Sequence, residues 1–179
     1  MENYRWSVTS LFKNTFDRNM ACNNLESPMF IEPFGLVRSP TDVNTILNYN
    51  PKYDCREFAF LTLLGGELPY GFALSGISWV DFLTSKGYKN VAKPQIGDLI
   101  MYGYPYGEDR FSDLHMGVIL DPQKALVISK FGQLIPYVHH ASFILDSYED
   151  YFLLFRKPAT QHETKALQSM LGRIGYLHS

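Results

Sequence analysis

The chain has 179 residues, of which 46% are hydrophobic and 19% are charged, and its formal net charge is -2. This length and apolar share are typical of one globular domain with a single core, so we expect one domain over residues 1–179. Because the net charge is small and no block of like charges occurs, an electrostatic face for nucleic acid is excluded.

The first twenty residues mix acidic and basic side chains and contain no apolar signal-peptide core, and no run in the chain reaches membrane-spanning length. We therefore expect no signal peptide, no membrane span and a protein that is cytoplasmic as synthesised. An effector exported without a cleaved signal, or a phage product, would have the same features. The sequence leaves the oligomeric state open.

The N-terminal half predicts an arm followed by helices. Residues 1–38 mix aromatic side chains with Asn, Pro and Gly without a regular period, so we expect a wrapping arm. A short helix is expected over 39–50. A second helix is expected to begin after Asp54 and to end at Gly65, since glycine can adopt the left-handed conformation that closes a helix.

A third helix in this half is expected to be capped by Ser75 or Ser78 and to end at Gly87. After Asn90 the apolar pattern changes to short extended runs separated by turn residues, which predicts strands. The five runs are DLIMYG, LHMGVIL, ALVIS, LIPYV and YFLLFRKP.

A closing helix is expected over 159–179, because Thr160 and Glu163 have the spacing of a capping box. The order of elements predicts an α+β fold, in which N-terminal helices pack on a five- to six-stranded antiparallel sheet.

Cys55 is the first candidate for chemistry. It follows Asp54 at the expected start of a helix, where main-chain N–H groups and the helix dipole lower the pKa of a thiol and favour the nucleophilic thiolate. The alternative is a buried structural cysteine, which is common. A disulfide between Cys22 and Cys55 is disfavoured, because two cysteines and no signal peptide do not indicate a disulfide-stabilised protein.

His115 is the best-placed base for such a nucleophile. It stands early in an expected strand with apolar neighbours, and Gly117 leaves room for another group to approach. A half-buried histidine bonded to a main-chain carbonyl is the structural alternative.

Three short motifs in order resemble one family. They are Tyr53-Asp54-Cys55, the segment PQIGDLI from Pro94 to Ile100, and HMGV from His115 to Val118. Together they resemble the papain-like amidohydrolases of bacterial type, which include the NlpC-type cell-wall endopeptidases and the CHAP amidases. The resemblance covers about residues 48–158, which we expect to form the catalytic core.

The resemblance implies roles for individual residues. Cys55 would be the nucleophile, His115 the general base, and the N–H of Cys55 part of the oxyanion hole. Tyr53 would lie beside the nucleophile, although a packing role is the alternative. Gly97 and Asp98 would form a structural turn into a strand.

The third catalytic residue departs from the family pattern. Relatives usually place His, Glu or Asn on the next strand, where this chain has ALVISKFGQ. Ser129 can accept a hydrogen bond from the imidazole, a cationic Lys130 cannot, and Gln133 could in a shifted register. The segment SKFG also resembles a CHAP-like variant with a later histidine, which makes His139 or His140 a candidate.

The tyrosine-rich segment from Tyr102 to Phe111 is expected to be a loop over the site, with Tyr104 and Tyr106 in contact with substrate. Zinc is disfavoured, because Cys55, His115, His139 and His140 include no suitably spaced ligand pair. We expect no metal and no cofactor.

The expected function is a cysteine hydrolase that cleaves an amide bond in a peptide, and the resemblance implies a peptidoglycan stem peptide as substrate. The alternatives are a protein deamidase or transamidase, and a non-catalytic binding domain on the same fold.

Overall fold

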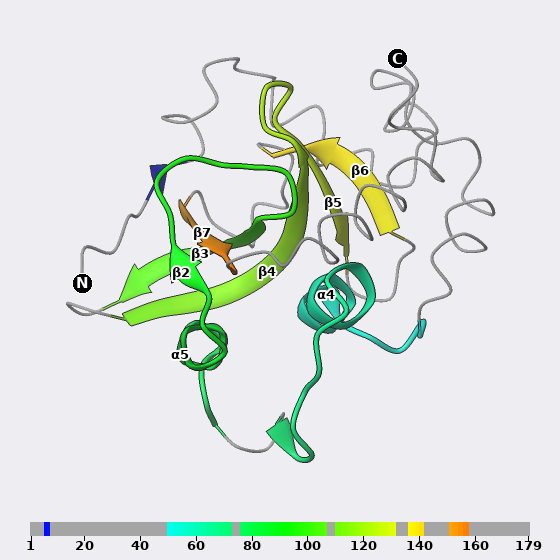
Figure 1. Ribbon diagram of the computed structural model, residues 1–179, viewed down its shortest axis with the longest axis vertical. Coiled ribbons are helices and arrows are strands. Elements are labelled where there is room, and N and C mark those ends of the chain that lie inside the picture. The colour runs from blue at the N-terminus through cyan, green and yellow to red at the C-terminus, as the bar shows by residue number, and fades with distance from the viewer. Residues whose placement is uncertain are drawn as a thin grey trace.

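The computed structural model describes residues 6–7, 50–72, 76–106, 110–131, 136–141 and 151–157. These residues form an α+β fold in which one antiparallel sheet carries helices on one face (Figure 1). The helix expected over 159–179, nearly all of the helix expected over 39–50, Cys22 and Gln133 lie outside the described residues.

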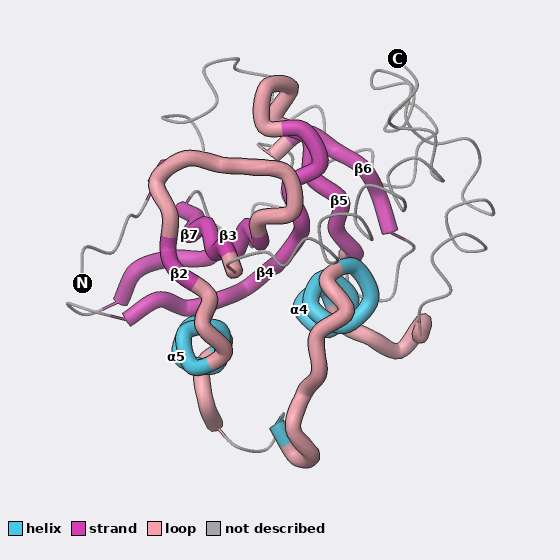
Figure 2. Tube along the Cα trace, in the orientation of Figure 1, coloured by secondary structure: helices cyan, strands magenta, loops and turns pink. Residues whose placement is uncertain are grey.

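The sheet has seven strands in the order β1-β7-β3-β4-β5-β6, and β2 pairs with β7 beside this path (Figure 2). All pairs are antiparallel. The five predicted strands are present as β3 to β7, whereas β1 and β2 have two residues each and are too short to show a period. The strands are β1 Trp6–Ser7, β2 Lys89–Asn90, β3 Leu99–Tyr106, β4 Arg110–Asp121, β5 Leu126–Lys130, β6 Pro136–His140 and β7 Tyr151–Arg156.

The helix predicted after Asp54 is present but changes its geometry. It begins as α4 (Cys55–Glu57) and continues as the π-helix η3 (Phe58–Leu63), a rare form that the apolar pattern did not predict. Gly65 follows with a φ of 61°, the left-handed conformation expected there.

The next helix is α5 (Trp79–Ser85). Ser78 caps it, because the Ser78 hydroxyl accepts a hydrogen bond from the N–H of Asp81. Gly87 follows the helix with a φ of 83°, which fits the predicted stop. Of the two expected caps, the structure therefore selects Ser78.

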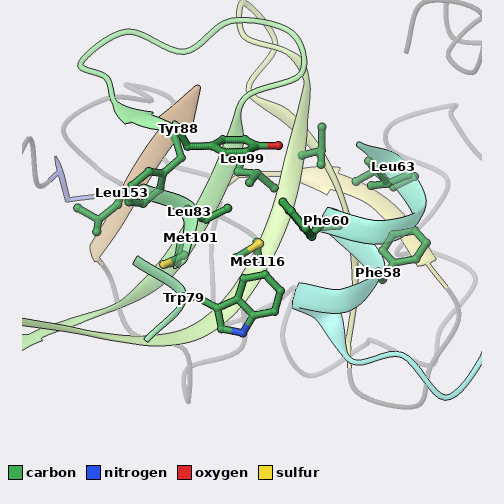
Figure 3. Close-up of a cluster of buried hydrophobic side chains, with 14 of the residues drawn as sticks. Phe58, Phe60, Leu63, Trp79, Leu83, Tyr88, Leu99, Met101, Met116 and Leu153 are labelled. Carbon is green, nitrogen blue, oxygen red and sulfur yellow. The ribbon is translucent and has the colours of Figure 1, made fainter. Parts of the chain in front are cut away.

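Alternation along the strands separates two apolar clusters. In β4, Met116 and Val118 face the helices, whereas Ile119 faces the other side of the sheet. Figure 3 shows the helix-side cluster, in which side chains of η3 and α5 meet those of β3 and β4. Its labelled members are Phe58, Phe60, Leu63, Trp79, Leu83, Tyr88, Leu99, Met101, Met116 and Leu153.

Asp98 fixes the start of β3 against the end of β7. Its side chain is almost fully buried and accepts hydrogen bonds from Nε of Arg156 at 2.7 Å and Nη2 at 2.6 Å. Gly97 precedes it with a φ of 89°, in the left-handed region that favours glycine. Gly97 and Asp98 therefore form a structural turn into the strand.

The described residues of the segment from Tyr102 to Phe111 belong to strands, so the prediction of a loop was wrong for them. Strand β3 extends to Tyr106 and β4 begins at Arg110, and residues 107–109 lie outside the described part. Tyrosine at every second position favours a half-exposed strand, and this strand preference outweighs the tendency of the intervening glycine and proline to disfavour one.

Candidate active site

Asp54 sets the position of Cys55 at the start of α4. Its carboxylate accepts hydrogen bonds from the N–H of Arg56 at 2.8 Å and of Glu57 at 2.9 Å. The Glu57 carboxylate in turn accepts from the N–H of Asp54 at 3.1 Å, which completes a capping box. Cys55 is therefore the first helical residue, and it is a free thiol that is only 7% exposed.

The main-chain N–H groups of Met116 in β4 and of Arg56 lie close to the Cys55 sulfur, and both lower the pKa of the thiol. Burial and the Asp54 carboxylate act in the opposite direction and raise the pKa of the thiol to about 11. The expected low pKa was therefore wrong, because loss of water outweighs the N–H groups of the helix start. Cys55 is therefore a neutral thiol at pH 7.

Arg56 ties the start of α4 to β4. Its Nη1 donates to the Asp113 carboxylate at 2.9 Å and its Nη2 to the Asp54 carboxylate at 2.8 Å. These two carboxylates outweigh the effect of burial and raise the pKa of the guanidinium further above its usual range. The start of α4 is thus anchored to β4 at Asp113, two residues before His115.

A β-bulge lies between that anchor and the histidine. His115 pairs with Tyr102 and Asp113 pairs with Gly103, so Leu114 is the additional residue in β4. The bulge allows Asp113 to reach the helix side, whereas His115 shares the other face with Tyr102. Bulges commonly redirect side chains beside active sites.

The imidazole of His115 is fully buried between aromatic rings. The Phe131 ring stacks on it with centroids 4.6 Å apart, and the Tyr102 ring lies at 5.8 Å. Burial, followed by the charges of His139 and Arg56, lowers the pKa of His115 well below its usual value. His115 is therefore neutral at pH 7 and can accept a proton.

Two hydrogen bonds join three side chains across neighbouring strands. Nε2 of His115 lies 2.9 Å from Oγ of Ser129, and the same Oγ lies 2.7 Å from Nε2 of His139. Nδ1 of His139 lies 2.9 Å from the main-chain oxygen of His140. We call this chain from His115 to the His140 carbonyl the imidazole relay.

The donors in the imidazole relay follow from its last member. The His140 carbonyl can only accept, so Nδ1 of His139 carries a proton. Burial lowers the pKa of His139 to about 4, so its Nε2 is bare at neutral pH and accepts the Ser129 hydroxyl proton. The oxygen of Ser129 then accepts from Nε2–H of His115, which assigns the basic lone pair of His115 to Nδ1.

Strand register determines where the candidates for the third residue lie relative to His115. Ser129 lies beside the outer nitrogen of His115, and His139 lies behind Ser129. His140 contributes its carbonyl, since Val127 pairs with His139 and Leu126 with His140, which puts the two imidazoles on opposite faces. Gln133 is outside the described residues.

The tyrosines expected at the substrate lie in different surroundings. Tyr53 is half-buried and packs against the helix-side cluster. Tyr104 and Tyr106 are 41% and 46% exposed, and their ring centroids are 6.3 Å apart. The sequence does not assign a site role to Lys130, because a cationic lysine cannot accept a hydrogen bond from the imidazole of His115. In the structure Lys130 is fully buried, and its Nζ donates a hydrogen bond to the Tyr53 carbonyl at 2.8 Å.

Across the described residues, no group of three or more His, Cys, Asp or Glu side chains is arranged to hold a metal ion. Likewise, no helix in the described part of the chain is long and apolar enough to span a membrane.

Residues 45–161, more than half of the chain, match the Amidase_5 family model, which is described as bacteriophage peptidoglycan hydrolase. The chain belongs to this family. Cys55 and the side chains of the imidazole relay all lie within the matched range. The match supports an enzyme that hydrolyses peptidoglycan, as the resemblance implied. No curated protein and no solved structure matches the chain significantly.

Proposed function

We propose that this peptidoglycan hydrolase is a cysteine amidohydrolase that cleaves an amide bond in the stem peptide, with Cys55 as nucleophile and His115 as general base. The observation that carries the proposal is the closeness of the Met116 N–H to the Cys55 thiol, whose pKa it lowers. It brings the sulfur to the residue that directly follows His115. We further propose a papain-like arrangement of the NlpC or CHAP type, as the sequence resemblance implies.

Nδ1 of His115 is the nitrogen that would take the thiol proton. It is the ring nitrogen nearer the main chain, and the main chain of the next residue contacts the sulfur. The tautomer assigned by the imidazole relay leaves the basic lone pair on the same atom. Because the thiol and the imidazole are both neutral at rest, proton transfer accompanies attack on the substrate carbonyl.

The reaction then follows acyl transfer. The sulfur bonds to the carbonyl carbon, and the N–H of Cys55 stabilises the oxyanion. The amide C–N bond breaks as Nδ1–H of His115 gives its proton to the leaving amine. A water molecule, deprotonated by the same Nδ1, attacks the thioester, releases the carboxylate and restores the thiol.

Ser129 and His139 would act as positioning residues in this scheme. When Nδ1 takes the proton, Nε2–H of His115 stays bonded to the Ser129 oxygen, and His139 holds the Ser129 hydroxyl proton in place. A neutral relay of this kind contributes about 0.5 to 1.5 kcal/mol per hydrogen bond.

The exposed tyrosines fit a substrate-binding role. Tyr104 and Tyr106 offer flat apolar faces with polar tips, which suit contact with a sugar or a peptide. We propose them as the rim of the substrate site and Tyr53 as the residue that borders the nucleophile. The family points to a phage product that is made in the host cytoplasm and acts on the wall.

Incubation of purified peptidoglycan with the protein tests the proposal through the release of new amino groups. The wild type and Cys22→Ser should release them, whereas Cys55→Ala and His115→Ala should lose at least about a thousandfold, as for other catalytic nucleophiles and bases. Activity that survives Cys55→Ala would overturn the mechanism. Peptidoglycan binding without release by the folded wild type would favour a binding domain.

A further inference from the structure

Lys130 ends β5 on the side of the sheet opposite to Ser129. Strand alternation directs it toward the helices, and the side chain is fully buried. Its Nζ donates a hydrogen bond to the main-chain oxygen of Tyr53 at 2.8 Å. Tyr53 directly precedes Asp54, the cap of α4, so the ammonium holds the turn from which the nucleophile helix begins.

Two opposing effects act on the charged form of Lys130: burial disfavours it, and nearby negative charges favour it. Burial lowers the pKa of the ammonium, and the carboxylates of Asp54 and Glu57, together with Cys55 whenever it is a thiolate, raise it. The net pKa is lowered. A buried ammonium is expensive unless hydrogen bonds and opposite charges compensate it, so a site that retains one needs an explanation.

We propose that Lys130 is a positioning residue for the nucleophile: its ammonium holds the Tyr53 carbonyl and compensates the negative charge that Cys55 gains when it loses its proton. The inference rests on the proposed role of Cys55. The proton moves from the sulfur to Nδ1 of His115, and Lys130 keeps its own protons throughout. A cation close to a thiolate favours the thiolate over the thiol, and this is the effect proposed here for Lys130.

Charged and titratable groups other than Lys130 also surround the thiol, and the test must distinguish their effects from that of Lys130. They belong to three elements: α4 with its cap (Asp54, Arg56 and Glu57), β4 (Asp113 and His115) and β6 (His139). Arg56 is the other cation, and two carboxylates bind it. Lys130 approaches from β5, so it can be replaced without changing either of those ion pairs.

The rate of Cys55 alkylation by iodoacetamide, measured against pH in the full chain, tests the proposal. All variants carry Cys22→Ser, so that the label reports on Cys55. Lys130→Met removes the charge and the donor, Lys130→Gln removes the charge but keeps an amide donor, and Lys130→Arg keeps the charge. Lys124→Met is the matched control, because Lys124 lies in the turn before β5 and its side chain is 65% exposed.

We expect Lys130→Met and Lys130→Gln to slow alkylation at pH 8 about tenfold and to shift the pH profile upward by about one unit, the effect of one nearby charge. Lys130→Arg should recover most of the rate, and Lys124→Met should leave it unchanged. Circular dichroism verifies that each variant is folded. If Lys130→Met does not fold, the comparison of Lys130→Gln with Lys130→Arg decides the question.

Unchanged alkylation in a folded Lys130→Gln variant would overturn the proposal. The proposed function fails separately, since its readout is the release of amino groups from peptidoglycan. Suppose that hydrolysis depends on Cys55 but that alkylation is unaltered in both Lys130→Met and Lys130→Gln. The proposed role of Lys130 would then be rejected, and the proposed function would stand. If the neutral variants are alkylated more slowly but the wild type does not hydrolyse peptidoglycan, the effect of Lys130 on the thiol is supported and the amidohydrolase function is rejected.

Discussion

Ser129 has a single hydroxyl proton and lies between two imidazole rings, so its hydrogen bonds can point in only one direction at a time. His139 sets that direction, because its own Nδ1–H is committed to a carbonyl. A residue without contact to the substrate can therefore determine which nitrogen of His115 is basic. Loss of His139 would free the Ser129 hydroxyl to donate to His115 and stabilise the wrong tautomer.

Two adjacent histidines provide a matched test of this direction. His139→Phe removes the acceptor of the Ser129 proton, and we expect kcat on peptidoglycan to fall about tenfold or more. His140→Phe keeps the main-chain carbonyl that the relay uses, so kcat should change less than threefold, about 0.6 kcal/mol. Equal losses in the two variants would contradict the assigned donors.

At the scale of elements, the cap of α4 has two opposing effects on Cys55. The Asp54 carboxylate holds the first N–H groups of the helix, which fixes the nucleophile in place. The same negative charge raises the pKa of the thiol. A substitution can separate these effects, since asparagine caps a helix nearly as well as aspartate.

In Asp54→Asn with Cys22→Ser, Cys55 should therefore react faster with iodoacetamide at pH 8, by about threefold to tenfold, because one nearby negative charge is gone. The free energy of unfolding should stay close to that of the parent. Asp54→Ala serves as the control, and it should lose about 1 kcal/mol with the cap. A slower reaction in a stable Asp54→Asn variant would disprove the assigned charge effect.

Gly117 controls the approach of β5 to β4. A Cβ at this position would lie 2.6 Å from Cγ1 of Val127 and 2.9 Å from the main-chain oxygen of Ile128. Gly117→Ala should therefore destabilise the fold by about 1 to 3 kcal/mol, as other overpacked sites do. Urea unfolding measures this change.

The double variant Gly117→Ala with Val127→Ala provides the control. It should lose less free energy of unfolding than the sum of the two single variants, because the shorter side chain removes one clash. Additive losses would show that the Val127 contact is unimportant.

The sequence predicted the strands well and the details of the site less well. Strands β3 to β7 are bounded by turn residues and show the period that a sheet requires. The choice of His139 over His140 depends on register across β5 and β6, which is a long-range property. Strand alternation was the available signal, because it puts His139 on the face of β6 opposite to Val138 and His140.

Two further features depended on tertiary contacts. The pKa of Cys55 reflects burial by distant segments, which no local motif reports. Similarly, the π-helical geometry of η3 is not visible in the composition of FAFLTL, because apolar residues suit either helix type.

At the scale of the whole molecule, the site extends across the plane of the sheet. Lys130 and the start of α4 lie on the helix side, whereas His115 and Ser129 share the other face. The Met116 N–H that contacts the sulfur belongs to the strand between them. The proposed proton transfer from Cys55 to His115 therefore has to pass the main chain of β4, and the imidazole relay depends on β4 and β5 remaining paired.

Stability should fall in acid because of the buried histidines. The pKa of His139 is lowered by burial to about 4, whereas in the unfolded chain it is about 6.5. The folded state thus binds fewer protons, so stability is complete above about pH 6.5 and decreases as the pH falls toward 4. The loss from His139 is about 3 kcal/mol, and His115 acts in the same direction.

Urea midpoints at pH 7.5 and pH 4.5 measure this dependence. We expect the midpoint of the wild type to fall over this range and that of His139→Phe to fall less, since one of the buried bases is absent. If the urea midpoint falls more steeply with acid in His139→Phe than in the wild type, protonation of His139 does not destabilise the fold and the predicted direction is wrong.

The π-helix η3 gives the nucleophile segment a fixed length. A π turn holds about one residue more than an α turn, so Phe58–Leu63 accommodates one additional residue shortly after Cys55. Because the wider turn absorbs that residue, Cys55 keeps its orientation relative to the buried side chains that follow. An insertion or deletion that the segment does not absorb in this way would rotate Cys55 by about 100° relative to those side chains, so chain length here constrains the candidate site without any of its residues being changed.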